Sequence, residues 1–275
     1  GGTMIETSDL AKIRMVGSAY AKTGRPVVLV ILGDGVHAGH QALIRAARAI
    51  RSAVVVVALR EGGAPDADVV WHYDAETLWP HGKTITVPTP DRGLEPVQDL
   101  ALPLALIGAL RPSDVVVGEK DYEYNLALNQ AVRDLHLGVN LHGVPTVRNA
   151  EGVAMSLRNT RLPAEHRTAA TAISAALTAG AHAAETGAEH VLEVTESVLR
   201  SAGVDPDYVA VRGKDLGPAP EQGDARLLVA TTLGGIRLID NVGLPLGVGF
   251  KNWDEYQSEQ LRDEAELLRS DVRGQ

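Results

Sequence analysis

The sequence predicts an α/β protein, with a parallel sheet in a larger first domain and a second, smaller α+β domain. Two strands of buried type, over 27–32 and 53–59, enclose a helical segment, and this order forms a parallel βαβ unit. After Pro145 the pattern changes to two helices followed by short strands. We therefore expect domains over 1–146 and 147–250, and a charged helical tail over 251–275.

Composition narrows the class of protein. The 275 residues are 45% hydrophobic and carry a formal net charge of −9 at pH 7, which argues against a nucleic-acid partner held by bulk electrostatics. The chain has no cysteine, and this excludes disulfides, thiolate metal sites and a cysteine nucleophile. No apolar run reaches membrane-spanning length, so we expect a cytoplasmic protein with no membrane partner.

The elements of the first domain follow from apolar runs and turn residues. Six consecutive apolar residues, from Val27 to Leu32, suit a strand that is covered on both faces. Ser8 can cap the helix before this strand, and Gly24 can close it. In chain order we expect helices over 8–22, 40–52, 100–110 (with Pro96 in its first turn) and 122–135, and strands over 27–32, 53–59, 69–71, 85–88, 114–118 and 139–144.

The second domain is expected to hold two helices and three short strands. The helices start at Pro163 and at 188, and the strands lie near 207–211, 227–231 and 236–240. From Lys251 the chain is charged and helical in pattern, with a narrow apolar stripe of Leu261, Ala265 and Leu268. A solvated helix and a dimer contact both fit this tail.

A glycine-rich turn follows the first strand of the βαβ unit. Gly33, Gly35 and Gly39 permit a sharp turn and a close approach of the backbone to a ligand. His37 and His40 stand at the start of the next helix, whose free N–H groups favour an anion. The turn is a candidate triphosphate site, and a plain βα turn with two solvated histidines is the alternative.

A second polar cluster follows the strand over 114–118. Lys120 can act as a point charge for a phosphate, and Asp121 can accept a hydrogen bond from a ribose hydroxyl. Ser156 and Arg158 stand on a loop between the domains that could close over the phosphates. Taken singly, these could be solvated surface residues. Because ligands of open α/β sheets bind at the carboxyl ends of strands, the two clusters together indicate a nucleotide site.

Five segments, in this order, resemble one family, the pantothenate synthetases (pantoate–β-alanine ligases), over most of residues 10–245. They are 37–40 (HAGH), 117–122 (VGEKDY), 143–148 (GVPTVR), 152–159 (GVAMSLRN) and 238–241 (LIDN). The resemblance implies a Rossmann-like ATP-binding domain of the nucleotidylyltransferase superfamily, a small C-terminal lid, ATP and Mg²⁺, and a homodimer formed through the larger domain. It also implies a two-step reaction. A carboxylate attacks the α-phosphate of ATP to give an acyl adenylate and pyrophosphate, and an amine then takes the acyl group, giving an amide and AMP.

The resemblance also implies roles for individual residues. The expected catalytic residues, which would hold and neutralise the phosphates, are His37, His40, Lys120 and Arg158, together with Ser156 as a hydroxyl donor. The remaining contacts to the nucleotide would come from Gly39 in the glycine-rich turn, Gly118 and Asp121 at the ribose, and the backbone of Val147 and Met155 at adenine. Preorganised donors at the α-phosphate, where negative charge gathers, lower the barrier of the first step.

The chain departs from the family on the side of the carboxylic acid. The family follows its second strand with Phe-Val-Asn-Pro-x-Gln-Phe, whose Asn and Gln help hold pantoate, whereas residues 58–63 here read ALREGG. The family continues Glu-Lys-Asp-Tyr with Gln-Gln, where this chain has Glu123 and Tyr124. A family Arg-Pro-x-His-Phe segment falls near Arg92, with Glu95 in place of the histidine. We therefore expect a substrate pocket of Arg92, Glu95 and Tyr124 that takes a small carboxylic acid other than pantoate, and a small amine that the sequence does not identify.

Two other functions stay open. Asp34 completes the D-x-x-H-x-G-H pattern of nucleotidylyltransferases, which transfer a nucleotide to a phosphate or a phosphorylated alcohol and stop there. We favour a plain turn role for Asp34, and the sequence does not decide whether it binds a metal. A non-catalytic nucleotide-binding paralogue would explain the shortened pocket, although the retained His37, His40, Lys120 and Arg158 weigh against it.

Overall fold

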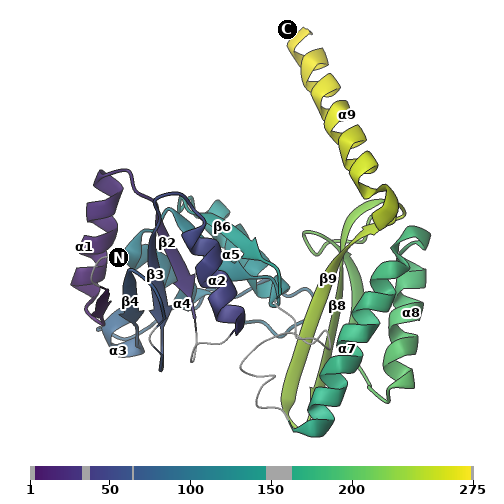
Figure 1. Cartoon of the computed structure of the whole chain (residues 1–275), viewed down its shortest axis with the longest axis horizontal. Helices are drawn as coiled ribbons and strands as arrows, with labels where there is room; N and C mark the ends of the chain where they lie inside the picture. The colour runs from purple at the N-terminus through teal and green to yellow at the C-terminus, as the bar shows by residue number, and fades with distance from the viewer. Residues whose placement is uncertain (1–3, 33–37, 64, 147–162, 274–275) are drawn as a thin grey trace. The chain divides into compact units, whose positions relative to one another are not determined.

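The computed structural model describes residues 4–32, 38–63, 65–146 and 163–273. The chain forms two compact units, Gly1–Pro163 and Ala164–Gln275 (Figure 1). Within the described ranges, no helix is both long and apolar enough to cross a membrane.

The first unit is built on a parallel sheet. Its strands are β1 (Ile5–Thr7), β2 (Val27–Ile31), β3 (Val54–Leu59), β4 (Val69–His72), β5 (Asp114–Gly118) and β6 (Asn140–Val144). They lie in the order β1-β4-β3-β2-β5-β6, and all neighbouring pairs are parallel. β2, β3 and β4 are almost wholly buried and apolar, as expected for strands that are covered on both faces.

Helices cover both faces of this sheet. They are α1 (Leu10–Lys22), α2 (Ala38–Arg48), α3 (Ala75–Leu78), α4 (Ala101–Leu110) and α5 (Tyr122–Asp134). Ile13 of α1 and Leu106 of α4 share a buried cluster with Leu29, whereas Ile44 of α2 shares the opposite cluster with Val28. Because successive strand residues point to opposite faces, alternate residues of β2 anchor helices on the two sides.

The chain first adds strands to the sheet on one side of β2 and then on the other side, so the strand order reverses at β2. β3 and β4 continue the sheet on one side of β2, and β5 and β6 continue it on the other. In such sheets the crevice outside the carboxyl ends of the two strands at the reversal is the usual ligand site. β2 and β5 therefore end at this reversal point, and the two predicted polar clusters follow these two strands in the sequence.

The second unit pairs two long helices with an antiparallel sheet (Figure 1). Its elements are α7 (Ala164–His182), η1 (Ala184–Thr186), α8 (Ala188–Ser201), β7 (Tyr208–Gly213), β8 (Gly223–Leu233), β9 (Ile236–Leu246), η2 (Phe250–Asn252) and α9 (Trp253–Arg273). β8 and β9 have 11 residues each, so two of the three expected short strands are long. The tail is helical as predicted, and Leu261 of its apolar stripe is 67% exposed.

The segment between α3 and α4 contradicts the sequence-based prediction. Residues 85–88 do not form a strand, and Pro88 makes only an isolated bridge to Asp99. Ile85 is 68% exposed, so its apolar side chain does not mark a buried strand. Pro96 lies outside α4, and Pro103 occupies the first turn of that helix instead. A proline there costs no hydrogen bond because the first N–H groups of a helix have no intrahelical partner.

Several boundaries also differ from prediction. Asp9, not Ser8, caps α1, and its Oδ1 accepts from the Ala11 amide over 2.9 Å. The helix α2 ends at Arg48, before the predicted residue 52, and the Ile50 amide then donates to the Ala47 carbonyl in a tighter turn. Two short elements, β1 and α3, carry too few residues to show a period and were not predicted.

Candidate active site

The turn over 118–121 joins the carboxyl end of β5 to α5 and has a fixed backbone. The amide of Glu119 donates to the Val144 carbonyl over 2.9 Å, which continues the ladder between β5 and β6. The side-chain amide of Asn125, one turn into α5, donates to the Gly118 carbonyl. The lysine and aspartate of this turn are therefore presented from a rigid base at the sheet edge.

The first turn of α2 lies next to this turn. Gly39 and His40 are in that first turn, and both are half-buried. A Cβ atom built on Gly118 would lie 3.9 Å from Cδ2 of Leu43, about one turn further along α2. The structure therefore brings the described parts of the two predicted clusters together, Gly39 and His40 on one side and residues 118–121 on the other.

Tyr124 lies in the first turn of α5 and stays neutral. Its hydroxyl donates to the Asp99 carbonyl over 3.4 Å, which is long for a hydrogen bond. Burial of the ring, with repulsion from Asp121, Asp99 and Tyr73, raises the pKa of Tyr124 to about 12. The Tyr73 hydroxyl donates to the Leu32 carbonyl just after β2, over 3.2 Å. Two phenols therefore stand near the carboxyl edge of the sheet, beside the predicted acid pocket.

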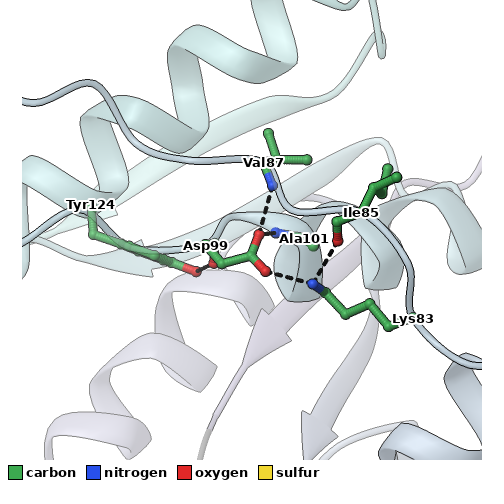
Figure 2. A network of polar contacts seen from close by, with 6 residues as sticks. All are labelled: Lys83, Ile85, Val87, Asp99, Ala101 and Tyr124. Carbon is green, nitrogen blue, oxygen red and sulfur yellow. Dashed lines mark hydrogen bonds and ion pairs between the residues drawn. The ribbon is translucent and has the colours of Figure 1, made fainter.

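A polar network around Asp99 holds the segment before α4 (Figure 2). The Lys83 ammonium lies 2.7 Å from the Asp99 carboxylate and also donates to the Ile85 carbonyl over 2.6 Å. The amides of Val87 and Ala101 donate to the same carboxylate over 2.8 and 2.9 Å. The Lys83 contact, with these two amides, lowers the pKa of Asp99 to about 2. The carboxylate is thus charged at any ordinary pH and keeps the segment folded on itself.

Arg92 and Glu95 are both held against α5. Arg92 Nη2 donates to Gln130 Oε1 over 2.7 Å. The Glu95 amide donates to the buried Glu123 carboxylate over 2.9 Å. At a rise of about 1.5 Å per residue, Gln130 lies roughly 9 Å further along α5 than Tyr124. Glu95 is therefore beside the first turn of α5, and the Arg92 guanidinium lies nearly two turns away from it.

The remaining predicted site residues lie outside the described residues. They are Asp34, His37, Val147, Met155, Ser156 and Arg158. The sequence-based prediction also missed Tyr73 and Asp99, which lie close to Tyr124, and Lys83, which pairs with Asp99. Only Asp99 had a local signal, since an aspartate just before an apolar helix is a typical start residue. Among the described residues, no group of three or more His, Asp or Glu side chains could hold a metal ion.

The strand order, with the start of α2 and the polar turn after β5 at one sheet edge, defines a nucleotide-binding protein of the Rossmann-like class. The sequence model of the family "Pantoate-beta-alanine ligase" matches residues 102–243. The pantothenate synthetase of Corynebacterium jeikeium is 38% identical over 283 residues, covering 90% of this chain and 92% of that protein. The pantothenate synthetase of Mycolicibacterium paratuberculosis is 37% identical, covering 85% and 87%.

Solved structures agree with these sequence matches. Pantothenate synthetase from Thermus thermophilus superposes with a TM-score of 0.73 at 26% identity, over 87% of this chain and 99% of that one. Pantoate-beta-alanine ligase from Francisella tularensis, complexed with beta-gamma ATP and beta-alanine, shares the fold with a TM-score of 0.67 at 21% identity. The chain belongs to the pantoate–β-alanine ligase family and is an ATP-dependent, amide-forming ligase. The resemblance seen in the motifs and the predicted fold class are thereby confirmed.

Proposed function

We propose that the chain joins a small carboxylic acid to a small amine through an acyl adenylate, and that its acid is not pantoate. ATP is cleaved to pyrophosphate in the first step and AMP leaves in the second. The observation that carries the changed specificity is Tyr124 in the first turn of α5, beside the polar turn over 118–121. The family resemblance puts a glutamine that holds pantoate at this position.

The nucleotide side of the site suits a triphosphate. Lys120 supplies a positive charge, and the positive end of the α2 helix dipole favours an anion. We assign phosphate binding to His40 and Lys120, with His37, Ser156 and Arg158 carried over from the family motif. Gly118 and Asp121 serve the ribose, with adenine against the backbone of Val147 and Met155.

Mg²⁺ would bind at this site mainly through the phosphate oxygens of ATP. Mg²⁺ keeps several waters and binds mainly through phosphate oxygens, with one or two protein carboxylates at most. The lack of a three-ligand group among the described residues is compatible with that mode. The ion would neutralise phosphate charge, and Lys120 would add a fixed cation beside it.

The predicted pocket for the carboxylic acid has the phenol of Tyr124 where the family resemblance puts a glutamine amide. A glutamine side chain offers two N–H donors and a carbonyl acceptor, whereas a phenol offers one donor and a bulky ring. The Tyr124 donor is already directed to the Asp99 carbonyl. A site that recognises a substrate through buried polar groups discriminates steeply against a molecule that leaves them unpaired. Pantoate should therefore be a poor substrate.

The test is ATP–pyrophosphate exchange with Mg²⁺ and no amine, run with pantoate and with a panel of small carboxylic acids. Exchange driven by another acid, at least about tenfold faster than with pantoate, supports the proposal. Exchange driven equally well by pantoate would refute the changed specificity. Without exchange from any acid, the ligase assignment of this chain would fail. An adenylylated product that persists when amines are added would point to nucleotidyl transfer.

The family resemblance also supports a homodimer formed through the larger domain and a cytoplasmic location. Light scattering on the purified chain tests the first, since a dimer has twice the 29.1 kDa of one chain. Cell fractionation tests the second.

A further inference from the structure

A cleft of about 690 Å³ lies between α1 and α4 in the first unit. Its lining residues lie along α1 from Arg14 to Lys22 and at the end of α4 from Gly108 to the C-cap, Arg111. α1 leads into β2 and α4 leads into β5, so both helices end at the amino-terminal edge of the sheet. The candidate active site lies at the carboxyl edge of the same two strands. The cleft is therefore separate from that site.

Three cations line the cleft, and no acidic residue does. They are Arg14 and Lys22 of α1 and Arg111 at the end of α4. The whole chain has 35 acidic and 26 basic residues, so this local excess of positive charge runs against its composition. Within the part of the chain that the structure describes, no side chain of the three makes a hydrogen bond or an ion pair. Positive charge is thus gathered around the cavity without an internal partner.

Helix electrostatics alone do not account for this arrangement. Lys22 is in the last turn of α1, and Arg111 is the C-cap of α4, where cations interact favourably with the helix dipole. Arg14 is in the first half of α1, where the dipole offers no such benefit. Arg14 nevertheless lines the same cavity as the other two, together with the hydroxyl-bearing Ser18.

The floor of the cleft is made of small residues. Gly17 lets the two helices touch, since a Cβ atom there would lie 1.9 Å from the Leu110 carbonyl oxygen. Gly108 faces open space, because nothing lies within 4 Å of a Cβ atom built on it. Ala21 and Ala109 complete this floor. A compact apolar group can lie on such a surface while an anionic group meets the cations at its rim.

We propose that the α1–α4 cleft binds a small organic phosphate, with its phosphate held by Arg14, Lys22 and Arg111 and its apolar part on the glycine and alanine floor. Arginine forks match phosphate oxygens in pairs, and lysine adds a point charge. The cavity volume lies within the range of about 300–1,000 Å³ that is typical of small-molecule sites. The ligand is neither the acid nor the amine of the ligase reaction, because the cleft opens at the other edge of the sheet.

The first experiment titrates the full chain with phenyl phosphate and follows backbone amides by NMR. We expect saturable shifts at Gly17, Ser18 and Gly108, and weaker binding of inorganic phosphate, which has no apolar part. The triple variant Arg14→Gln, Lys22→Gln, Arg111→Gln should bind at least about tenfold more weakly, because all three charge-assisted contacts to the phosphate are lost together. Lys12→Gln removes an exposed α1 charge outside the cleft and should leave binding unchanged.

A second pair of variants tests the floor. Gly108→Leu fills the open space and replaces a helical glycine with a better helix former, so the chain should fold and phenyl phosphate should no longer bind. Ala19→Leu adds the same bulk to an exposed α1 position outside the cleft and should bind normally. Pyrophosphate exchange should be unaffected in every variant.

Three results would overturn the proposal. The first is the absence of saturable shifts at the cleft. The second is equal affinity in the triple variant and the unsubstituted chain. The third is shifts confined to α2 and residues 118–121, which would assign the binding to the active site. Equal affinity for inorganic phosphate would overturn the assignment of an apolar part to the ligand.

Discussion

At the scale of single residues, Tyr124 is the position that tests acid specificity most directly. Tyr124→Gln restores the amide that the family resemblance puts here, and we expect pantoate-driven pyrophosphate exchange to rise at least about tenfold. Tyr124→Phe keeps the ring and removes the hydroxyl that donates to Asp99, so it should not gain activity with pantoate. The KM for ATP should change less than about twofold in both. If pantoate drives exchange equally in all three proteins, Tyr124 does not set specificity.

Asp99 gives the segment before α4 a pH-dependent stability. Its pKa is about 2 in the folded chain against an ordinary 3.8, because Lys83 and two backbone amides stabilise the carboxylate. A lowered folded-state pKa stabilises the protein above the unfolded pKa, and this contribution is lost as pH falls from about 4 to about 2.

The variant Asp99→Asn should therefore melt at a lower temperature than the parent at pH 7, and the difference should shrink toward zero near pH 2. Melting followed by circular dichroism between these pH values measures both. Asp91→Asn removes a charge from the same segment without touching the Lys83 pair, and it is the matched control. A melting difference that stays constant across this range would show that the ion pair is not its source.

At the scale of elements, two glycines test the packing of α1 on α4. A Cβ atom on Gly17 would lie 1.9 Å from the Leu110 carbonyl oxygen, so Gly17→Ala forces the helices apart. We expect a loss of about 1–3 kcal/mol, as is typical of overpacked cores. Gly108→Ala meets nothing within 4 Å and should stabilise by up to about 1 kcal/mol through helix propensity. Urea unfolding measures both, and equal effects would contradict the close contact of the helices.

The elements that could be predicted from the sequence are those whose own pattern is strong. The apolar run that starts at Val27 forms β2, which is buried on both faces. A central strand of a parallel sheet is the structure that buries such a continuous apolar run. The predicted strand over 85–88 failed because the stability of that segment comes from Asp99, more than ten residues away in sequence. Alternation of apolar residues could not distinguish an exposed Ile85 from a buried one.

For the candidate site, the positions of the motifs relative to the predicted strands predicted which residues lie together, and hydrophobic periodicity did not. Gly118 ends β5 and the next three residues lead into α5, while Gly39 and His40 lie in the first turn of α2, as expected for turns at one sheet edge. The neighbours of Tyr124 could not be predicted, because Tyr73 and Asp99 reach it from separate loops through tertiary contacts. The Arg92 contact to Gln130 likewise depends on how the irregular segment lies along α5.

At the scale of the whole molecule, the chain divides into two units with separate cores. Leu29 and Val56 belong to the core of the first unit, and Leu177 and Leu227 are buried in the second. Since the described residues that we propose to bind the nucleotide belong to the first unit, ATP should stabilise the two cores unequally. A ligand that binds only the folded form stabilises it according to its concentration relative to Kd.

Hydrogen exchange measured by mass spectrometry on the intact chain tests this. At about 100 times Kd, ATP with Mg²⁺ should stabilise β2 and β5 by up to about 2.7 kcal/mol, which slows their exchange roughly 100-fold. Exchange in β8 and β9 should slow less than about threefold, because these strands lie in the other unit. The same titration without Mg²⁺ is the control and should give weaker protection if the ion neutralises the phosphates. Equal protection in both sheets would mean that the units unfold as one cooperative block, so that ATP binding depends on the second unit as much as on the first.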